Sequence, residues 1–148
     1  MDEGHGLDLS RPHRLVRPRH LGFRVLGQLI ASGTPVVAIE RDTGGRFLDD
    51  ARRTGVPILV RDMKDDQALL DAGIQHARAI VIATNDDMAN LEVALDARRM
   101  NPKIRIIMRQ FDQQIADKLR EAKLIDEAFS SAALAAPAVA EMARAALK

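Results

Sequence analysis

The stretch Ala79-Ile-Val-Ile-Ala-Thr84, which runs on into Asn85-Asp-Asp87, decides the fold. An unbroken apolar run of this length, bounded by polar residues, is typical of a β-strand that is covered on both faces. Strands of that kind belong to parallel sheets packed between helices. The segment 86–100 that follows has helical spacing, with Leu91, Ala94 and Leu95 expected on its buried face, and it stops at Asn101-Pro102. The stretch therefore predicts a central parallel strand leading into a helix.

The same alternation of strand and helix extends to both sides of this stretch. Because it calls for right-handed βαβ crossovers, we expect an α/β, Rossmann-like, three-layer fold with a parallel sheet of order 3-2-1-4-5, with or without a sixth strand. We expect fully buried strands at residues 36–39, 80–83 and 104–108, and a central first strand at residues 13–16. Shorter strands are expected at 57–60 and 128–129. Helices are expected from Val25 to Gly33 and at 46–54, 66–72, 113–122 and 131–148, with Pro137 either in the first turn of the last helix or kinking it.

Length and composition exclude several classes of protein. The chain has 148 residues, enough for one domain, and 22 basic against 21 acidic residues leave a net charge of +1, which argues against a nucleic-acid partner. It has no Cys, which excludes disulfides, thiolate nucleophiles and Cys-ligated metals, and it has neither Trp nor Tyr. No apolar run approaches the roughly 18 residues that span a bilayer, and the N-terminus lacks the apolar core of a signal peptide. We therefore expect a cytoplasmic protein, peripheral to the inner membrane at most through a partner.

Three segments of different character divide the chain. Residues 1–12 are polar and irregular, and we expect a disordered or aberrant N-terminal extension there. Residues 13–130 carry the Rossmann-like pattern, and the Ala-rich segment 131–148 is a helical candidate for a dimer arm.

Polar residues follow each expected strand, at the edge where open parallel sheets bind their ligands. Glu40 lies about twenty residues after Gly22, near the offset at which a Rossmann fold bonds a ribose diol. Asp62, Thr84 and Arg109 end the next three strands. An arginine at the end of a strand is suited to binding an anion, and the alternative is an ion pair of Arg109 with Asp86 or Asp87. Glu40 would favour a free 2′-hydroxyl group but does not distinguish NAD from ADP.

The chain resembles the regulator-of-potassium-conductance N-terminal domain, also called the KTN or TrkA-N domain. The resemblance covers residues 21–139 and is strongest from Ala79 to Asp87 and on to Asn90-Leu91. It also rests on four further segments, which are residues 22–26, 36–42, 69–74 after Asp62, and 104–109 followed by 129–137.

The resemblance implies a Rossmann-like domain that pairs into a homodimer, or a larger ring, and binds NAD(H) or ATP/ADP. It implies a partner in a membrane-embedded potassium channel or transporter subunit, whose potassium transport the domain controls by ligand-dependent dimer rearrangement. The resemblance also implies the cofactor-binding residues, carried over by position. Gly22 would belong to the site, Glu40 would lie at the adenosine ribose with Arg41 beside it, and Asp62 and Met63 would lie near the adenine. Thr84 would lie under the pyrophosphate, Asp87 and Asn90 at the next helix, and Arg109 would reach towards phosphate or a partner subunit.

The glycine-rich loop departs from the family pattern Gly-x-Gly-x-x-Gly. Aligned on Gly22, the first two glycines fall at Arg17 and Arg19, with Pro18 between them. Long side chains there would occupy the space of a pyrophosphate, and Pro18 removes a donor N–H. The arginines either neutralise phosphate in a rebuilt loop or, in the interpretation we favour, mark a damaged dinucleotide site. Because an Arg/Pro/His-rich stretch is typical of GC-rich coding sequence read out of frame, we also hypothesise a misplaced start or frame error upstream of His20.

Three functions remain open from the sequence. The first is a non-catalytic regulatory domain that binds a nucleotide. The second is a degenerate dimerisation module without nucleotide binding. The third, a small NAD-dependent oxidoreductase, is the least supported, because there is no Tyr and His76 is expected to be a surface residue. We therefore expect no enzymatic activity.

Overall fold

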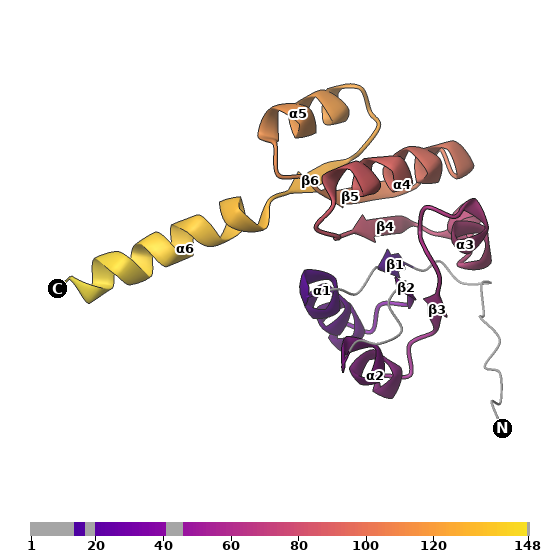
Figure 1. Cartoon of the computed structure of the whole chain (residues 1–148), viewed down its shortest axis with the longest axis horizontal. Coiled ribbons are helices and arrows are strands. Elements are labelled where there is room, and N and C mark those ends of the chain that lie inside the picture. Colours follow the sequence, from indigo (N-terminus) through magenta and orange to yellow (C-terminus); the bar gives the residue numbers. More distant parts are fainter. Residues whose placement is uncertain (1–13, 17–19, 41–45, 148) are drawn as a thin grey trace.

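A single six-stranded parallel sheet forms the centre of the computed structural model, which describes residues 14–16, 20–40 and 46–147 (Figure 1). The strand order is β3-β2-β1-β4-β5-β6. The strands are β1 (Arg14–Val16), β2 (Val36–Glu40), β3 (Ile58–Val60), β4 (Ala79–Ile82), β5 (Arg105–Arg109) and β6 (Glu127–Phe129). The expected Rossmann-like fold, its strand order and the sixth strand are confirmed.

The first strand takes the central place expected for it. Leu15 is in register with Val37 of β2 on one side and with Ile80 of β4 on the other. Strand β1 therefore lies between β2 and β4, and the chain continues to one side of it through β2 and β3 and to the other side through β4, β5 and β6. Open α/β sheets bind their ligands at such a switch point. His13 and residues 1–12 and 17–19 lie outside the described part of the chain.

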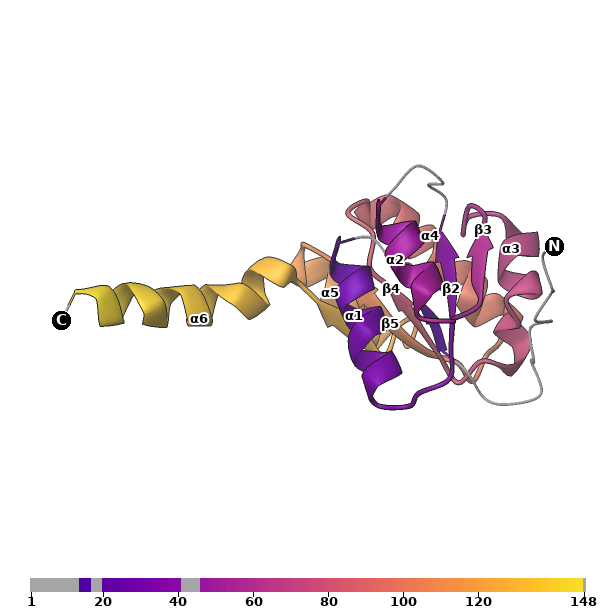
Figure 2. The ribbon, with the colours of Figure 1, turned by 90° about the horizontal axis from the view of Figure 1, so that it is seen from below.

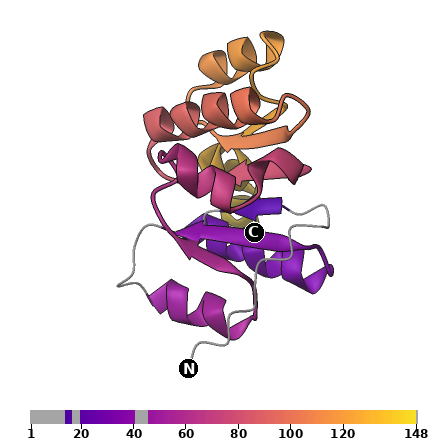
Figure 3. The same ribbon diagram turned by 90° about the vertical axis from the view of Figure 1, so that its right-hand side faces the viewer.

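Helices cover both faces of the sheet. They are α1 (His20–Ala31), α2 (Arg46–Arg53), α3 (Asp66–Asp71), α4 (Asp87–Met100), α5 (Gln113–Glu121) and α6 (Ser131–Ala146), with a short 3-10 turn η1 (Ile74–His76). Helices α2 and α5 lie at opposite ends of the body (Figure 3). This agrees with the sheet, because α2 leads into the edge strand β3 and α5 leads into the opposite edge strand β6. Helix α6 leaves the body as a single projecting rod (Figure 2).

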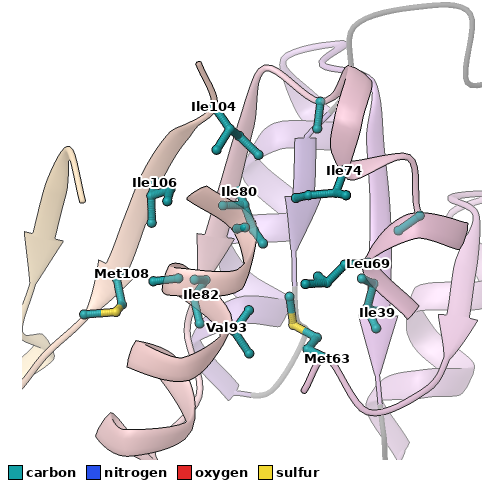
Figure 4. Packing of buried hydrophobic residues seen from close by; sticks show 14 of the residues in the cluster. Ile39, Met63, Leu69, Ile74, Ile80, Ile82, Val93, Ile104, Ile106 and Met108 are labelled. Carbon is teal, nitrogen blue, oxygen red and sulfur yellow. The ribbon is translucent and has the colours of Figure 1, made fainter. Parts of the chain in front are cut away.

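The larger core lies between the sheet and the layer of α3, α4 and α5. Ile80, Ile82, Ile106 and Met108 contribute side chains from β4 and β5 that are completely buried. Leu69 of α3 and a small-residue face of α4 pack onto them (Figure 4). Burying each large aliphatic side chain stabilises the fold by about 1.5–3 kcal/mol, so this layer holds the carboxyl ends of the strands in fixed positions.

The opposite face of the sheet is covered less completely. Leu26 of α1 packs against Val36, Ala38 and Val81 in a smaller core. Ile107 and Phe129, on the β5–β6 side of this face, are only half-buried.

Polar caps start the helices directly after the strands. Asp65, Asp86, Asp112 and Ser130 are the N-caps of α3, α4, α5 and α6, and each side chain accepts a hydrogen bond from a backbone N–H of the first turn. Because a cap follows each strand closely, the N-termini of these helices gather at the carboxyl edge of the sheet.

Two expectations from the sequence need correction, and one open alternative is resolved. The buried residues of α4 are Asn90, Val93, Ala94 and Ala97, whereas Leu95 is 42% exposed, because the small residues of this helix pack onto the sheet. The segment 104–108 alternates instead of being fully buried, since Ile106 and Met108 face the larger core, whereas Ile107 lies on the less completely covered face. Of the two alternatives for Pro137, the structure excludes the first turn, because Pro137 lies in the interior of α6.

Candidate functional site

The ends of β4 and β5 are joined by a buried hydrogen-bonded pair, Thr84 and Asn90. Thr84 directly follows the apolar run and is 3% exposed, and Asn90 lies in the first turns of α4 and is 0% exposed. The Thr84 hydroxyl donates to Asn90 Oδ1 at 2.5 Å and accepts from the Asp86 N–H at 3.1 Å. The Asn90 amide donates to the backbone carbonyls of Thr84 at 3.0 Å and Arg109 at 3.1 Å.

Every polar atom of the Asn90 side chain has a hydrogen-bond partner within the protein. Both amide hydrogens and the amide oxygen have protein partners, and no part of the residue reaches solvent. Asn90 therefore fixes the spacing between the ends of β4 and β5. Because its own side chain is buried, a ligand would contact the strand ends that Asn90 holds and not Asn90 itself.

Asp87 fixes the loop after β5. Its Oδ2 atom accepts a hydrogen bond from the backbone N–H of Phe111 at 3.0 Å. Asp86 is occupied as the N-cap of α4, where it accepts from the Ala89 N–H at 3.0 Å. The two carboxylates thus perform different structural tasks at one helix N-terminus.

Arg109 ends β5 beside the base of α6. Its guanidinium group donates to the hydroxyl of Ser131 at 3.1 Å, and within the described residues it forms no ion pair with Asp86 or Asp87. A cavity of about 200 Å³ opens here, lined by Asn85, Asp87, Arg109, Phe111, Ser130 and Ser131. Arg109 therefore offers positive charge to a cavity without a carboxylate neutralising it directly.

The other half of the expected site lies at the ends of β2 and β3. Glu40 is the last residue of β2 and is in register with Val60 of β3, two residues before Asp62. Asp62 is half-buried, and its Oδ1 atom accepts from the Lys64 N–H at 3.0 Å. Gly22 is buried in the first turn of α1. Arg41, and Arg17 and Arg19 of the altered glycine loop, lie outside the described residues.

Met63 occupies a different place from the one that the sequence suggests. Its side chain is 1% exposed and packs in the larger core beside Ile39 and Leu69 (Figure 4). Burial of an apolar side chain in the core removes its surface from water and stabilises the fold, whereas a position at a solvent-facing edge does not.

Sequence reasoning missed several residues at the β5–β6 end of the sheet. Phe111 is 78% exposed at the cavity, and Ser130 and Ser131 line its other side. Gln110 is 6% exposed, and its Oε1 atom has no hydrogen-bond partner among the described residues. Open parallel sheets bind ligands at the carboxyl ends of their strands. The two serines directly follow the strand expected at 128–129, so this principle would have identified them if it had been applied to that strand.

The described residues contain neither a metal-binding cluster nor a helix suited to crossing a membrane. No group of three or more His, Asp or Glu side chains is arranged for a metal ion within the described ranges. Among the same residues, no helix combines the length and the apolar character that a membrane span requires.

The residues described on the β4–β5 side fit a phosphorylated ligand. Arg109 faces the cavity without a carboxylate partner in the described ranges, and the N-termini of α4 and α6 direct backbone N–H groups towards the same edge. Helix N-termini and arginine are both suited to phosphate groups. Asp87 opposes an anion in the same cavity, so the fit depends on which part of a ligand lies there.

Comparison with known proteins relates the chain to potassium transport proteins. KefC from Enterobacter sp. (strain 638), a glutathione-regulated potassium-efflux system protein, is 27% identical over 125 residues, which are 81% of this chain and 19% of KefC. Potassium channel protein 1 from Methanocaldococcus jannaschii is 28% identical over 108 residues, which are 68% of this chain and 32% of that protein. The chain thus spans less than a third of the length of either relative.

Solved structures share the fold. The TrkA-N domain of the inner membrane protein ybaL from Escherichia coli superposes with a TM-score of 0.76 at 21% identity, over 88% of this chain and 95% of that domain. The Kef C-terminal domain from Shewanella denitrificans in its AMP-bound form gives a TM-score of 0.75 at 18% identity, over 93% and 81% of the two chains. The GsuK channel bound to NAD gives 0.68 at 20% identity, over 82% of this chain and 22% of the channel.

A match to a whole family is stronger evidence than any single likeness. Residues 20–131 match the TrkA-N domain. This range includes strands β2 to β6 and ends at the first residue of α6. The chain therefore belongs to the TrkA-N domain family.

Proposed function

We propose that this domain regulates a potassium channel or a potassium uptake or efflux system by binding NAD(H) or ATP/ADP and changing the arrangement of a homodimer. The observation that carries the proposal is the construction of the β4–β5 edge, where the buried Thr84–Asn90 pair positions Arg109 beside a cavity. A fully buried polar pair stabilises little when compared with an apolar core but fixes geometry, which a ligand site needs.

The bound nucleotide would lie across the switch point between β1 and β4. Glu40 at the end of β2 would accept hydrogen bonds from the adenosine ribose, with Arg41 and Asp62 nearby. Thr84 would support the loop under the pyrophosphate, Asp87 and Asn90 would hold the start of α4, and Arg109 would attract the distal phosphate or a partner subunit. Two of the superposed proteins contain such ligands, NAD in GsuK and AMP in the Kef domain.

The projecting helix α6 supports dimerisation. Leu134, Val139 and Met142 are 68%, 60% and 70% exposed, and no residue of α6 is buried. An amphipathic or apolar helix with no buried face inside its own subunit gains stability by packing against a partner, and the Ala-rich surface of α6 lets another backbone approach closely. We propose that α6 packs against the second subunit, which joins two nucleotide clefts in one particle.

The proposed function needs no chemical step. His76 is exposed in η1, and it is the one histidine of the sequence outside the first twenty residues. A ligand that binds one dimer arrangement more tightly than another shifts the population towards it, and this differential affinity is sufficient to act on an attached pore.

The altered glycine loop favours a second candidate, a dimerisation module that binds no nucleotide. Arg17, Pro18 and Arg19 stand where the family has its first two glycines and the residue between them. Both candidates share the dimer, so they differ only in the response to a ligand.

A thermal unfolding experiment with NADH, ATP and ADP distinguishes the two candidates. A ligand present at ten times its Kd stabilises the folded state by about 1.4 kcal/mol, which raises the Tm by a few degrees for a domain of this size. The regulatory candidate predicts that shift for at least one nucleotide and its loss in Glu40→Ala. An unchanged Tm with all three nucleotides would leave the dimerisation module as the function.

A further inference from the structure

Three basic residues lie together at the amino edge of the sheet, where β4 and β5 begin. Arg78 directly precedes β4, Arg105 is the first residue of β5, and Lys103 lies in the turn between α4 and β5. The Arg105 N–H donates to the Arg78 carbonyl at 3.0 Å, so the two arginines are neighbours across the sheet. All three residues are exposed, and we call them the basic corner.

The charges of the basic corner are not used by the fold. Within the described ranges, none of its three side chains has a hydrogen-bond or ion-pair partner. The carbonyl groups beyond the end of α4 are instead bound by Arg98, which donates to Pro102 at 3.0 Å and to Ile104 at 2.7 Å. The local structure is therefore held by another arginine, and the basic corner remains available to a ligand.

The neighbouring carboxylates do not neutralise the basic corner. The other charges at this end of α4 are paired with one another, Arg98 with Asp126 at 2.9 Å, and Arg99 with Asp66 at 2.9 Å and Asp96 at 3.3 Å. Glu121 ends α5 and is followed two residues later by Lys123, so that turn carries both signs. Glu127 begins β6 as an exposed carboxylate, and it forms no ion pair with any described residue. Although the whole chain has a net charge of only +1, this edge presents three cations against one carboxylate where β4, β5 and β6 begin.

The basic corner lacks the apolar centre of a protein–protein contact. Among the described residues, no exposed large apolar side chain belongs to the segments 76–79 or 101–107. A protein interface normally buries an apolar core inside a polar rim. A basic surface, by contrast, is attracted to an anionic bilayer by charge alone, at the level of the headgroups.

We propose that the basic corner docks on the phosphate groups of an anionic phospholipid surface. Guanidinium and ammonium groups both bind phosphate oxygens, and the contact requires no pocket. The choice of lipid over a loop of a membrane-embedded partner rests on the proposed function. Cytoplasmic loops of membrane proteins carry an excess of Lys and Arg, so they repel the basic corner, whereas the anionic headgroups of the same leaflet attract it.

Docking at this edge leaves the rest of the domain free. All six strands are parallel, so Thr84 and Arg109 lie at the opposite edge of the sheet. Helix α6 also begins at that opposite edge, directly after β6 (Figure 1). The amino edge therefore contacts a membrane without covering the proposed nucleotide site or the proposed dimer helix.

Cosedimentation of the full-length protein with vesicles tests the proposal. The wild-type chain is expected to bind vesicles of equal parts phosphatidylglycerol and phosphatidylcholine at low salt and to leave pure phosphatidylcholine unbound. Release is expected at about 1 M salt, where the screening length falls to about 3 Å. The combined variant Arg78→Gln, Lys103→Gln and Arg105→Gln is expected to lower the partition coefficient on the order of 100-fold, since each cation near an anionic membrane contributes roughly fivefold.

A matched control removes the same charges elsewhere. Arg24→Gln, Arg52→Gln and Lys118→Gln neutralise two arginines and one lysine at exposed residues of α1, α2 and α5. This variant is expected to keep the partition coefficient within about threefold, because charges separated by more than the Debye length of roughly 10 Å are largely screened. Circular dichroism checks that both variants are folded.

A charge-conserving variant gives an independent test. Arg78→Lys with Arg105→Lys is expected to bind anionic vesicles as the wild type does, because a headgroup surface responds to charge. Loss of binding in this variant, equal losses in the two triple variants, or no binding of the wild type to anionic vesicles would overturn the proposal. Binding to poly-glutamate but not to vesicles would also overturn it, in favour of an acidic protein segment. Nucleotide titration tests the proposed function separately, since no residue of the basic corner belongs to the nucleotide site.

Discussion

At the scale of single residues, Asn90 links two strands that no local sequence rule connects. Its amide donates to the carbonyls of Thr84 and Arg109, which are 6 and 19 positions away in the chain. The Thr84 carbonyl is buried and the Arg109 carbonyl partly buried, and removal of the amide takes its donor from each. An unsatisfied buried polar group costs about 1–3 kcal/mol.

The substitution Asn90→Ala is therefore expected to lower the free energy of unfolding by about 2–3 kcal/mol, measured by urea denaturation. Asn85→Ala, at an exposed residue of the neighbouring cavity, is the control and is expected to change it by less than about 0.5 kcal/mol. Equal effects of the two substitutions would show that the hydrogen-bonded pair does not hold the strand ends.

The altered glycine loop makes a prediction of its own. If Arg17 and Arg19 obstruct a pyrophosphate, Arg17→Gly with Arg19→Gly removes both side chains and is expected to tighten nucleotide binding on the order of tenfold, or about 1.4 kcal/mol. Calorimetric titration of the double variant checks this. Weaker binding would instead identify the arginines as phosphate ligands in a rebuilt loop.

At this scale the sequence predicted which residues lie at the ends of strands. It did not predict whether their side chains point towards a ligand or into the core. Thr84 and Arg109 were expected at strand ends and are found there. Met63 and Asn90 were expected near a ligand, yet their side chains are buried. The polar or apolar identity of a residue after a strand does not reveal which way its side chain turns.

At the scale of elements, α4 shows why an apolar pattern can misplace a face. The larger residues Leu91 and Leu95 suggested the core side, but the sheet takes Val93, Ala94 and Ala97, whose small side chains allow close approach. When a helix has apolar residues on two sides, tertiary packing determines which side is buried. The sequence of that helix alone does not show which side this is.

Helix α5 supplies a pH-dependent contact at the same scale. A hydrogen bond from Gln113, and then one from Arg120, lower the pKa of Asp117 below its ordinary value. Because the folded pKa is depressed, this contact stabilises the fold above the unfolded pKa of Asp, and the stabilisation is lost as the pH falls through the folded pKa.

The substitution Gln113→Ala is expected to raise the pKa of Asp117, since it removes the strongest of these contacts. The measurement is an NMR titration of the Asp117 side-chain carboxyl carbon. Gln67→Ala serves as a control, because Gln67 forms the equivalent bond to Asp71 on α3 and leaves Asp117 untouched. An unchanged titration of Asp117 would contradict the assignment.

At the scale of the whole molecule, the strand order was predictable and the direction of α6 was not. Alternating strands and helices restrict an open parallel sheet to few topologies, and the observed order is one of them. No residue of α6 is buried in its own subunit, so the direction of this helix does not follow from the alternation of strands and helices.

The projecting α6 predicts that assembly depends on it. At tens of micromolar, light scattering is expected to give at least a dimer for the full chain and a smaller particle for a chain that ends at Ser130. A full-length monomer would contradict the homodimer, and an unchanged particle after truncation would place the interface elsewhere.

The central claim is that this domain binds a nucleotide at the carboxyl edge of its sheet. Calorimetric titration of the full-length protein with NADH, ATP and ADP tests it most directly, with Glu40→Ala titrated in parallel. The account predicts saturable binding of at least one nucleotide, weakened by about 1–3 kcal/mol in Glu40→Ala because the ribose diol loses its acceptor. Absence of binding for all three nucleotides, with the assembly intact by light scattering, would contradict it.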